Sequence, residues 1–362
     1  MEHSIINFVG GFAVQLFVVF NCFILSGCIT KYEASGIDEA GDILVVEGVI
    51  TDDETVITLS RSMNLTGEEN HLYYVDNAEV YVECDDGMRF HAEPHDWGLS
   101  RNGQYTIKTE QLNLACKYCL KINIDKHEYV SDFSYPIETP EIDSVFWSKR
   151  ALREPIMIYV ATHPQENELM YFRWTYNEDW EYHSFVDLSN DGYPHRCWSS
   201  ANSRDILLSS AENTIFGQFA ETIIEMPPSD RKLSVLYRIT VTQNAISKRA
   251  HDYFANIKKN AEQMGSIFAP TPSELRGNIV CITDPSMPVI GYIDVSTATQ
   301  KAQLYISGKN VYEKPYRECM VIYNNPPPSY IVQGYHRICV DCTWDGDGIP
   351  RKPNKWPDYR DF

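Results

Sequence analysis

The sequence predicts a mainly β protein made of two β-sandwich domains, the second of which carries one amphipathic helix. Short stretches that alternate apolar and polar residues, or that are rich in β-branched residues, recur with turn signals roughly every ten residues. One longer stretch has the three-to-four-residue spacing of a helix. The chain has 362 residues, which is enough for two domains with cores of their own.

An apolar segment at residues 5–25 ends at Leu25-Ser26-Gly27-Cys28. An apolar residue, two small residues and a cysteine form the cleavage box of a bacterial lipoprotein, in which the thiol receives the lipid. We therefore expect residues 1–27 to be a lipoprotein signal peptide and Cys28 to be the lipid-attachment residue. Two alternatives remain, a retained membrane anchor and a buried core segment. The first seven residues, MEHSIIN, contain no Lys or Arg, which departs from a typical signal peptide.

The first domain follows a short polar tether at residues 28–41. A turn at residues 85–87 and alternating patterns predict an N-terminal β-sandwich over residues 42–137. Its expected strands lie at 43–50, 55–60, 76–84, 102–107 and 119–124. Pro136 and Pro140 frame the segment that we expect to link it to the second domain.

The second β domain is expected over residues 138–342. Its predicted strands lie at 142–147, 156–161, 169–176, 233–242, 277–283, 289–295 and 303–306, with short ones at 319–323 and 330–333. A helix near 244–265 is predicted between them, capped by Asn244 and ended by Gly265. Its apolar stripe consists of Ile246, Ala250, Tyr253, Ile257, Ala261 and Met264.

The last segment, residues 343–362, is predicted to be an irregular C-terminal strap. Prolines at 350, 353 and 357 remove backbone donors and interrupt both helix and strand. Such a segment stays ordered only when its side chains dock on another surface.

The net charge of −19 limits the classes of partner. Binding to nucleic acid or to anionic lipid needs a basic face, and the sequence contains no long basic run. We therefore expect no nucleic-acid partner.

Eight cysteines remain beyond the predicted lipid-attachment residue, and an even number in an exported chain indicates disulfides. We expect at least three of the four possible bonds, with the pairing left open. Two C-x-x-C pairs also suggest zinc, but most of the second domain separates them, far more than the roughly 15–20 residues of a compact zinc module. The sequence therefore predicts no metal and eight disulfide candidates: Cys84, Cys116, Cys119, Cys197, Cys281, Cys319, Cys339 and Cys342.

Catalytic motifs with the required spacing are absent from the sequence, so no catalytic residue and no cofactor are predicted. Adjacent acids such as Glu178 and Asp179 suit glycoside hydrolysis, but pairs of this kind arise by chance in so acidic a chain. Residues 345–348, DGDG, resemble part of a calcium loop. Thr343 and Asn354 stand where that loop needs carboxylates, so a turn is expected.

Aromatic residues form the remaining candidate sites. Phe172, Trp174 and Tyr176 alternate and are predicted to fill the core of the second domain. The acidic run at 177–182 is predicted to be a hairpin tip that exposes two further aromatics. The strap carries three more aromatic residues. The alternative to a binding role is that these residues cover the domain's own sheet. The candidate binding surface therefore comprises Trp180, Tyr182, Trp344, Trp356 and Tyr359.

Four sequence blocks carry a resemblance to a known family. They are the lipobox with LVVEGVIT and ITLSRS, then NAEVYVECDDG with NGQYTIKTE, then the block from YRITVTQNAISKRAHDYF through GNIVCITDPSMPVIGYIDVSTA, and finally CVDCTWDGDGIPRKPNKWPD. The chain resembles a Bacteroidota lipoprotein family known as domain of unknown function four-two-four-nine. Both domains are expected to be immunoglobulin-like or carboxypeptidase-regulatory-like sandwiches. The N-terminal half in particular resembles carboxypeptidase-regulatory-like sandwiches, a fold that serves mainly in display and interaction.

The resemblance implies a role near TonB-dependent receptors similar to SusC. We therefore expect a lipid-anchored protein of the outer membrane, on its periplasmic or cell-surface face, acting as a non-enzymatic binding or accessory component of a TonB-dependent nutrient-uptake system. The alternatives are a structural or adhesive surface lipoprotein without a transport partner and, third, a hydrolase. The sequence does not identify the ligand.

Overall fold

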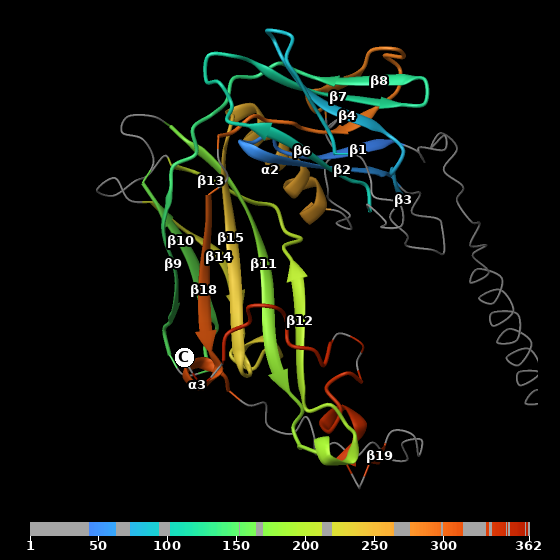
Figure 1. The fold of residues 1–362 in the computed structure, drawn as a ribbon. Coiled ribbons are helices and arrows are strands. Elements are labelled where there is room, and N and C mark those ends of the chain that lie inside the picture. The colour runs from blue at the N-terminus through green and yellow to red at the C-terminus, as the bar shows by residue number, and fades with distance from the viewer. Residues whose placement is uncertain are drawn as a thin grey trace, which may run out of the picture. The chain divides into compact units, whose positions relative to one another are not determined.

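The described part of the chain is mainly β, as the sequence predicts, with mostly antiparallel sheets and two helices (Figure 1). The computed structural model describes residues 43–62, 73–93, 102–151, 153–163, 169–211, 219–263, 276–297, 300–313, 331–332, 335–344, 346, 348–358 and 360. The leader with Cys28 therefore lies outside the described residues, as do Cys319 and Tyr359.

The first sandwich is built from two five-stranded sheets. One has the order β17-β1-β2-β3, with β6 also paired to β2, and consists of β17 (Val289–Gly291), β1 (Leu44–Gly48), β2 (Asp53–Arg61), β3 (Tyr73–Tyr74) and β6 (Gln104–Glu110). The other has the order β16-β8-β7-β4-β5 and consists of β16 (Ile279–Cys281), β8 (His127–Ser131), β7 (Tyr118–Ile124), β4 (Glu79–Cys84) and β5 (Arg89–His91).

The core of this sandwich follows from the period-two pattern of its strands. Ile57 and Leu59 on β2 and Leu120 and Ile122 on β7 point inward and are buried in one cluster. Because successive side chains of a strand point to opposite faces, every second residue reaches this core. The predicted strands of residues 42–137 are thus confirmed.

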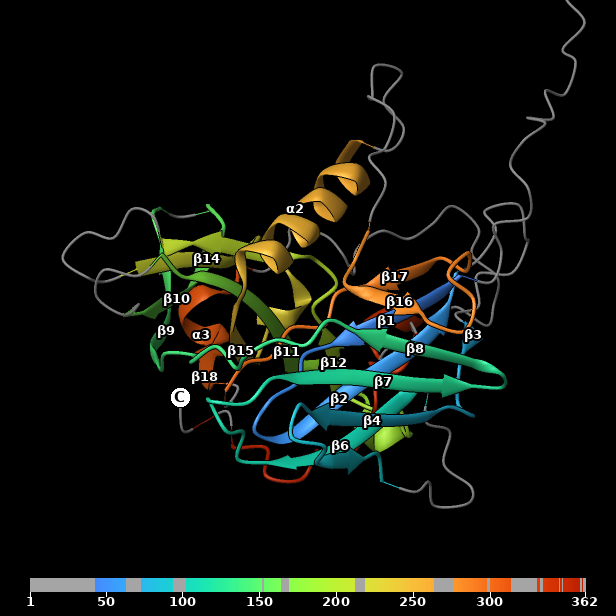
Figure 2. The ribbon, with the colours of Figure 1, turned by 90° about the horizontal axis from the view of Figure 1, so that it is seen from above.

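Two strands of the first sandwich come from much later in the chain. β17 pairs in parallel with β1, and β16 pairs with the edge of β8 (Figure 2). The sequence assigned residues 277–295 to the second domain, whereas these pairings place them in the sheets of the first. The close approach of the two segments needs glycine, because a Cβ on Gly277 would lie 1.6 Å from the carbonyl oxygen of Gly291.

In the second sandwich, a three-stranded sheet packs against a five-stranded sheet. The smaller has the order β14-β10-β9, from β14 (Phe219–Met226), β10 (Ile156–Thr162) and β9 (Ile142–Lys149). The larger has the order β12-β11-β15-β18, with β13 also paired to β11, from β12 (Arg196–Asn202), β11 (Tyr171–His183), β15 (Leu236–Ile246), β18 (Gln300–Ser307) and β13 (Leu207–Ser210). A separate hairpin pairs β19 (Ile331–Val332) with β20 (Tyr335–His336).

The central strand β11 confirms one prediction and corrects another. Phe172 and Trp174 are fully buried, and Tyr176 packs partly buried against the same core, as predicted. The expected hairpin tip at 177–182 does not form, because β11 continues through it and pairs with β15 as far as Glu181.

Helix α2 (Lys248–Gln263) confirms the predicted amphipathic helix. Its cap is Ser247, whose hydroxyl accepts from the Ala250 amide at 3.1 Å. Asn244, the expected cap, belongs to β15 instead. The short elements are α3 (Gly308–Val311) and the 3-10 turns η1 (Ser189–Asp191), η3 (Arg231–Leu233) and η5 (Arg337–Cys339).

Candidate functional site

The predicted aromatic binding surface is corrected by the structure. Trp180 and Tyr182 are 7% and 1% exposed and belong to the core of the second sandwich. Trp356, 4% exposed, packs on Trp198 and Leu236. Trp344 is partly buried, with the Arg337 guanidinium 4.4 Å from its ring centre. The strap thus covers the protein's own sheet, which was the alternative interpretation of its aromatic residues.

A buried carboxylate explains why the strap docks where it does. Glu181 is fully buried and accepts from Arg196 Nη2 at 2.7 Å, from His183 Nε2 at 2.9 Å and from Trp356 Nε1 at 3.0 Å. Burial raises the pKa of Glu181, but these hydrogen bonds outweigh it and hold the pKa below its usual value. The acidic residues that suggested an exposed tip therefore have internal partners.

The cysteines form fewer disulfides than the sequence predicted. Cys197 is bonded to Cys342, and Cys339 is also in a disulfide. Cys84, Cys116, Cys119 and Cys281 are free thiols. At least three bonds among the eight candidates were expected, and in this structure four of the eight are thiols. The two C-x-x-C pairs are not brought together, because Cys116 and Cys119 lie in the first sandwich whereas Cys342 is bonded to Cys197 in the second.

A Ser–His–Asp set lies beside these residues. Ser184 Oγ lies 2.8 Å from His195 Nδ1, and Asp187 lies 4.0 Å from His195 Nε2. The Val186 carbonyl lies 2.9 Å from the serine hydroxyl and is a second acceptor for its proton. These contacts link the segment after β11 to the residue before β12.

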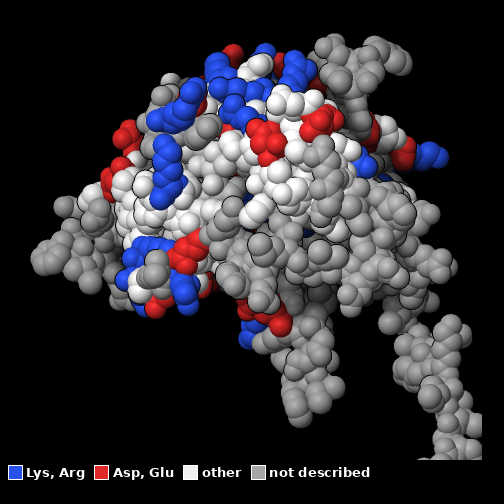
Figure 3. All heavy atoms as spheres, turned by 90° about the horizontal axis from the view of Figure 1, so that it is seen from below, with Lys and Arg blue, Asp and Glu red and all other residues white. Residues whose placement is uncertain are grey.

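Charge is mixed over the surface of the second sandwich. The face in Figure 3 shows Lys and Arg side chains lying close to Asp and Glu. Three ion pairs of this sandwich bring Nζ or Nη2 within 2.6–2.7 Å of a carboxylate oxygen: Lys149–Glu313, Lys232–Glu178 and Arg238–Asp179.

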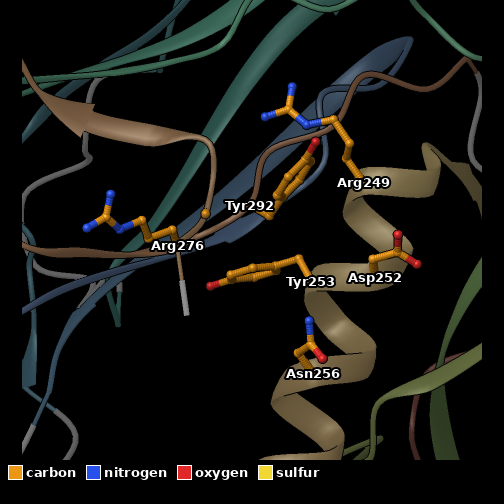
Figure 4. A pocket seen from close by; sticks show the side chains of 7 residues that line it. Arg249, Asp252, Tyr253, Asn256, Arg276 and Tyr292 are labelled. Carbon is orange, nitrogen blue, oxygen red and sulfur yellow. The ribbon is translucent and has the colours of Figure 1, made fainter. Parts of the chain in front are cut away.

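The best candidate for a ligand site is a pocket of about 230 Å³ beside α2 (Figure 4). Helix α2 supplies one wall, and the residues that flank β16 and β17 supply the other. The lining residues are Arg249, Asp252, Tyr253, Asn256, Arg276, Gly277 and Tyr292.

The helix wall is fixed at its start and along its length. The amide of Ser247 donates to Asp294 Oδ2 at 2.6 Å, which ties the start of α2 to the segment after β17. Burial raises the pKa of Asp294, and these backbone donors offset part of the effect. Further along, Phe254 packs on the Arg173 guanidinium of β11, 4.3 Å from the ring centre.

Two tyrosines form the floor of the pocket. Tyr253 is 6% exposed and Tyr292 is 7% exposed, and their ring centres lie 5.6 Å apart. The buried Tyr253 hydroxyl has no hydrogen-bond partner among the described residues. Burial raises the pKa of Tyr253, and the nearby Gly291 backbone offsets this without making a hydrogen bond of normal geometry. An unpaired buried hydroxyl costs free energy, so a ligand atom that pairs with it is stabilised.

Two arginines lie at the mouth of the pocket. Arg249 makes a 3.3 Å contact with Asp132, and both side chains are largely exposed, so the contact is weak. Arg276 lies on the opposite wall and is exposed. Asp252 points away from them (Figure 4) and its carboxylate binds Lys248 at 2.6 Å along the helix. The pocket therefore has one guanidinium group on each wall, and a guanidinium suits a carboxylate or another small anion.

A second hollow lies at the predicted linker and has the opposite character. Asp52, Glu138 and Glu141 line this space of about 410 Å³ together with Thr139 and Thr297. Asp52 Oδ1 already accepts from the Leu112 amide at 2.9 Å. We take the pocket beside α2 as the candidate site because it combines positive charge with a buried unpaired hydroxyl.

Sequence reasoning missed this pocket, since Tyr253 was counted only as part of an apolar stripe. All seven lining residues lie in the third of the sequence blocks quoted above, residues 237–298. The resemblance of this block to the family was the sequence signal that could have pointed to the pocket. In the described part of the chain, no helix is long and apolar enough to cross a membrane.

Comparison with known proteins gives one family. The family described as Domain of unknown function (DUF4249) matches residues 29–302. No curated protein matches the chain significantly. The family match covers most of the chain, including every residue that lines the pocket beside α2. The chain therefore belongs to the DUF4249 family.

Proposed function

We propose that this protein is a lipid-anchored binding component of a TonB-dependent nutrient-uptake system in the outer membrane of a Bacteroidota species. It acts without catalysis and holds a small anionic ligand in the pocket beside α2. The Leu-Ser-Gly-Cys box supports the anchor, and the family resemblance supports the setting beside a SusC-like receptor.

One observation carries the binding role. Tyr253 places a buried hydroxyl without a described partner in a pocket whose mouth carries Arg249 and Arg276. A carboxylate pairs with guanidinium groups through strong charge-assisted hydrogen bonds, while a sugar or aromatic body packs on the tyrosine rings. Recognition therefore needs both an anionic group and a flat body.

The ligand class is tested by calorimetry on residues 29–362. Glucuronate, which carries a carboxylate, is compared with glucose, its neutral parent, and with benzoate, which adds a flat apolar body. We expect the carboxylates to bind and glucose not to bind. Arg249→Ala and Arg276→Ala should each weaken binding about tenfold, the loss of one charge-assisted contact.

Lys258→Ala is the matched control, because Lys258 is an exposed cation on the same helix outside the pocket. Equal weakening by Lys258→Ala would show a general charge effect and would refute the pocket. Tyr253→Phe should weaken binding without lowering the melting temperature, which separates the hydroxyl from the packing of the ring.

The receptor partner is tested by mild detergent extraction from the native membrane, followed by affinity purification. We expect a SusC-like receptor to co-purify in stoichiometric amount. An acylated protein that retains neither a receptor nor a small anion would favour the structural or adhesive surface role.

A further inference from the structure

Two of the free thiols lie side by side in the first sandwich. Cys84 is the last residue of β4, and its partner across the sheet is Tyr118 at the start of β7. Cys116 lies two residues before Tyr118, in the turn that leads into β7. Both cysteines pack on the core between the two sheets.

The local backbone holds these thiols together. The two Sγ atoms and a carboxylate oxygen of Asp85 all lie within 4.8 Å of one another. The Asp85 amide donates to the Lys117 carbonyl at 2.9 Å, and the Cys116 amide donates to Asn113 at 3.0 Å. Both cysteines are thus fixed by hydrogen bonds beside the end of the same strand pair.

The other two free cysteines are placed differently. Cys119 pairs with Glu83 and, one residue from Tyr118 in the strand, points to the opposite face from Cys84. Cys281 Sγ lies 3.3 Å from Thr283 Oγ1 and 3.9 Å from His127 Nδ1. Cys84 and Cys116 are therefore the pair that can bond without a change of strand register.

We propose that Cys84 and Cys116 form a disulfide in the exported protein, which ties the end of β4 to the turn before β7. The inference rests on the export contained in the proposed function. The oxidant is a disulfide-bearing thiol oxidoreductase, and the two protein thiols are oxidised while its disulfide is reduced to two thiols.

The exchange has two balanced steps. The Cys116 thiolate attacks one sulfur of the oxidant, which forms a mixed disulfide and releases the first thiol of the oxidant. Cys84 then loses its proton and attacks the Cys116 sulfur, which closes the protein disulfide and releases the second thiol. Cys116 is partly exposed and Cys84 is buried, so the oxidant reaches Cys116 first.

The surroundings of Cys84 support this order. Burial raises the pKa of Cys84 to about 12, and the neighbouring Asp86 and Cys116 side chains add to the effect. Its thiol donates to Asp85 Oδ1 at 3.6 Å. A protonated, buried thiol is a poor first nucleophile, and it is suited to the second, intramolecular step.

The test uses the native protein, quenched in acid and alkylated with N-ethylmaleimide before digestion with trypsin without reductant. Cleavage after Arg61, Arg89, Lys108 and Lys117 places Cys84 in peptide 62–89 and Cys116 in peptide 109–117, apart from Cys119. We expect these two peptides to be linked, and Cys119 and Cys281 to carry the maleimide.

The linked pair supports the proposal, and two other results overturn it. The first is that Cys84 and Cys116 both carry the maleimide in a mature protein, which has lost residues 1–27 and carries lipid. The other is reduced thiols with one equivalent of a bound metal ion by elemental analysis, since two thiols and a carboxylate also suit a soft metal. A C84A/C116A double variant that keeps Cys197–Cys342 controls for misfolding.

If the protein is not exported, the result is different: the precursor is intact, lies in the cytoplasm and has an unmodified Cys28. In that case residues 29–362 are sent to the periplasm of a Gram-negative host with a cleavable signal peptide, and the same digest is repeated. Linked peptides there support the disulfide, and two alkylated peptides refute it.

Discussion

Replacing Trp356 with alanine should destabilise the protein strongly, because this residue fastens the C-terminal strap. The indole is 4% exposed against Trp198 and Leu236, and its N–H donates to Glu181 at 3.0 Å. Truncating a buried tryptophan costs about 3–5 kcal/mol. Losing one hydrogen bond to a buried carboxylate adds about 1–2 kcal/mol, since His183 and Arg196 still contact Glu181.

The total is about 5 kcal/mol, and it converts to a shift in melting temperature. The unfolding entropy is about 2.1 cal/mol/K per residue, so a unit of roughly 320 residues loses about 1 °C for each 0.7 kcal/mol. Trp356→Ala should therefore melt about 7 °C lower in a calorimetric scan of residues 29–362. Trp356→Phe keeps most of the packing and should lose about a third of that.

Leu169→Ala serves as the control, because Leu169 is half exposed and should change the melting temperature by less than about 1 °C. A Trp356→Ala protein that melts within 1 °C of the wild type would show that the strap contributes no stability. The aromatic residues of the strap would then be free for a partner, and the structural interpretation would be wrong.

Three further outcomes are expected. Cys28→Ser should abolish acylation and accumulate precursor, and a mature, lipid-free form on the membrane in mass spectrometry would contradict this. Cys342→Ser should lower the free energy of unfolding by about 2–5 kcal/mol, measured by urea titration, because it opens a bond between residues 145 positions apart. The lowered pKa of Glu181 stabilises the fold above the unfolded pKa of about 4.3, and this stability is lost as pH falls through the folded pKa. Glu181→Gln should therefore lower stability at pH 7 and flatten its decline below pH ~4.5, and an unchanged acid profile would contradict the assignment.

Local patterns predicted the elements of the fold well and their partners poorly. The helix was visible because Ala250, Tyr253 and Ile257 recur at helical spacing. The membership of β16 and β17 in the first sandwich was not visible, because a short strand carries no information about which distant edge it joins.

The prediction that the aromatic residues are exposed was wrong for a related reason. Trp180 and Tyr182 stand among acidic residues, which suggested exposure. Glu178 is buried with Lys232 Nζ and Tyr237 Oη each at 2.7 Å, so its charge is balanced inside the protein. Because these partners lie more than fifty positions away in sequence, only the folded chain reveals that the run is internal.

The parallel pairing of β1 with β17 sets the order in which the chain can fold. The first sheet receives its edge strand only after almost 300 residues have been synthesised. Until then β1 and β8 each present an open hydrogen-bonding edge beside an unfinished core. Folding of the N-terminal sandwich is thus coupled to the arrival of the helix and of the strands that follow it, and contacts of such long range form slowly. A chain truncated after residue 137 would remain open at both edges and would aggregate rather than fold as an independent domain.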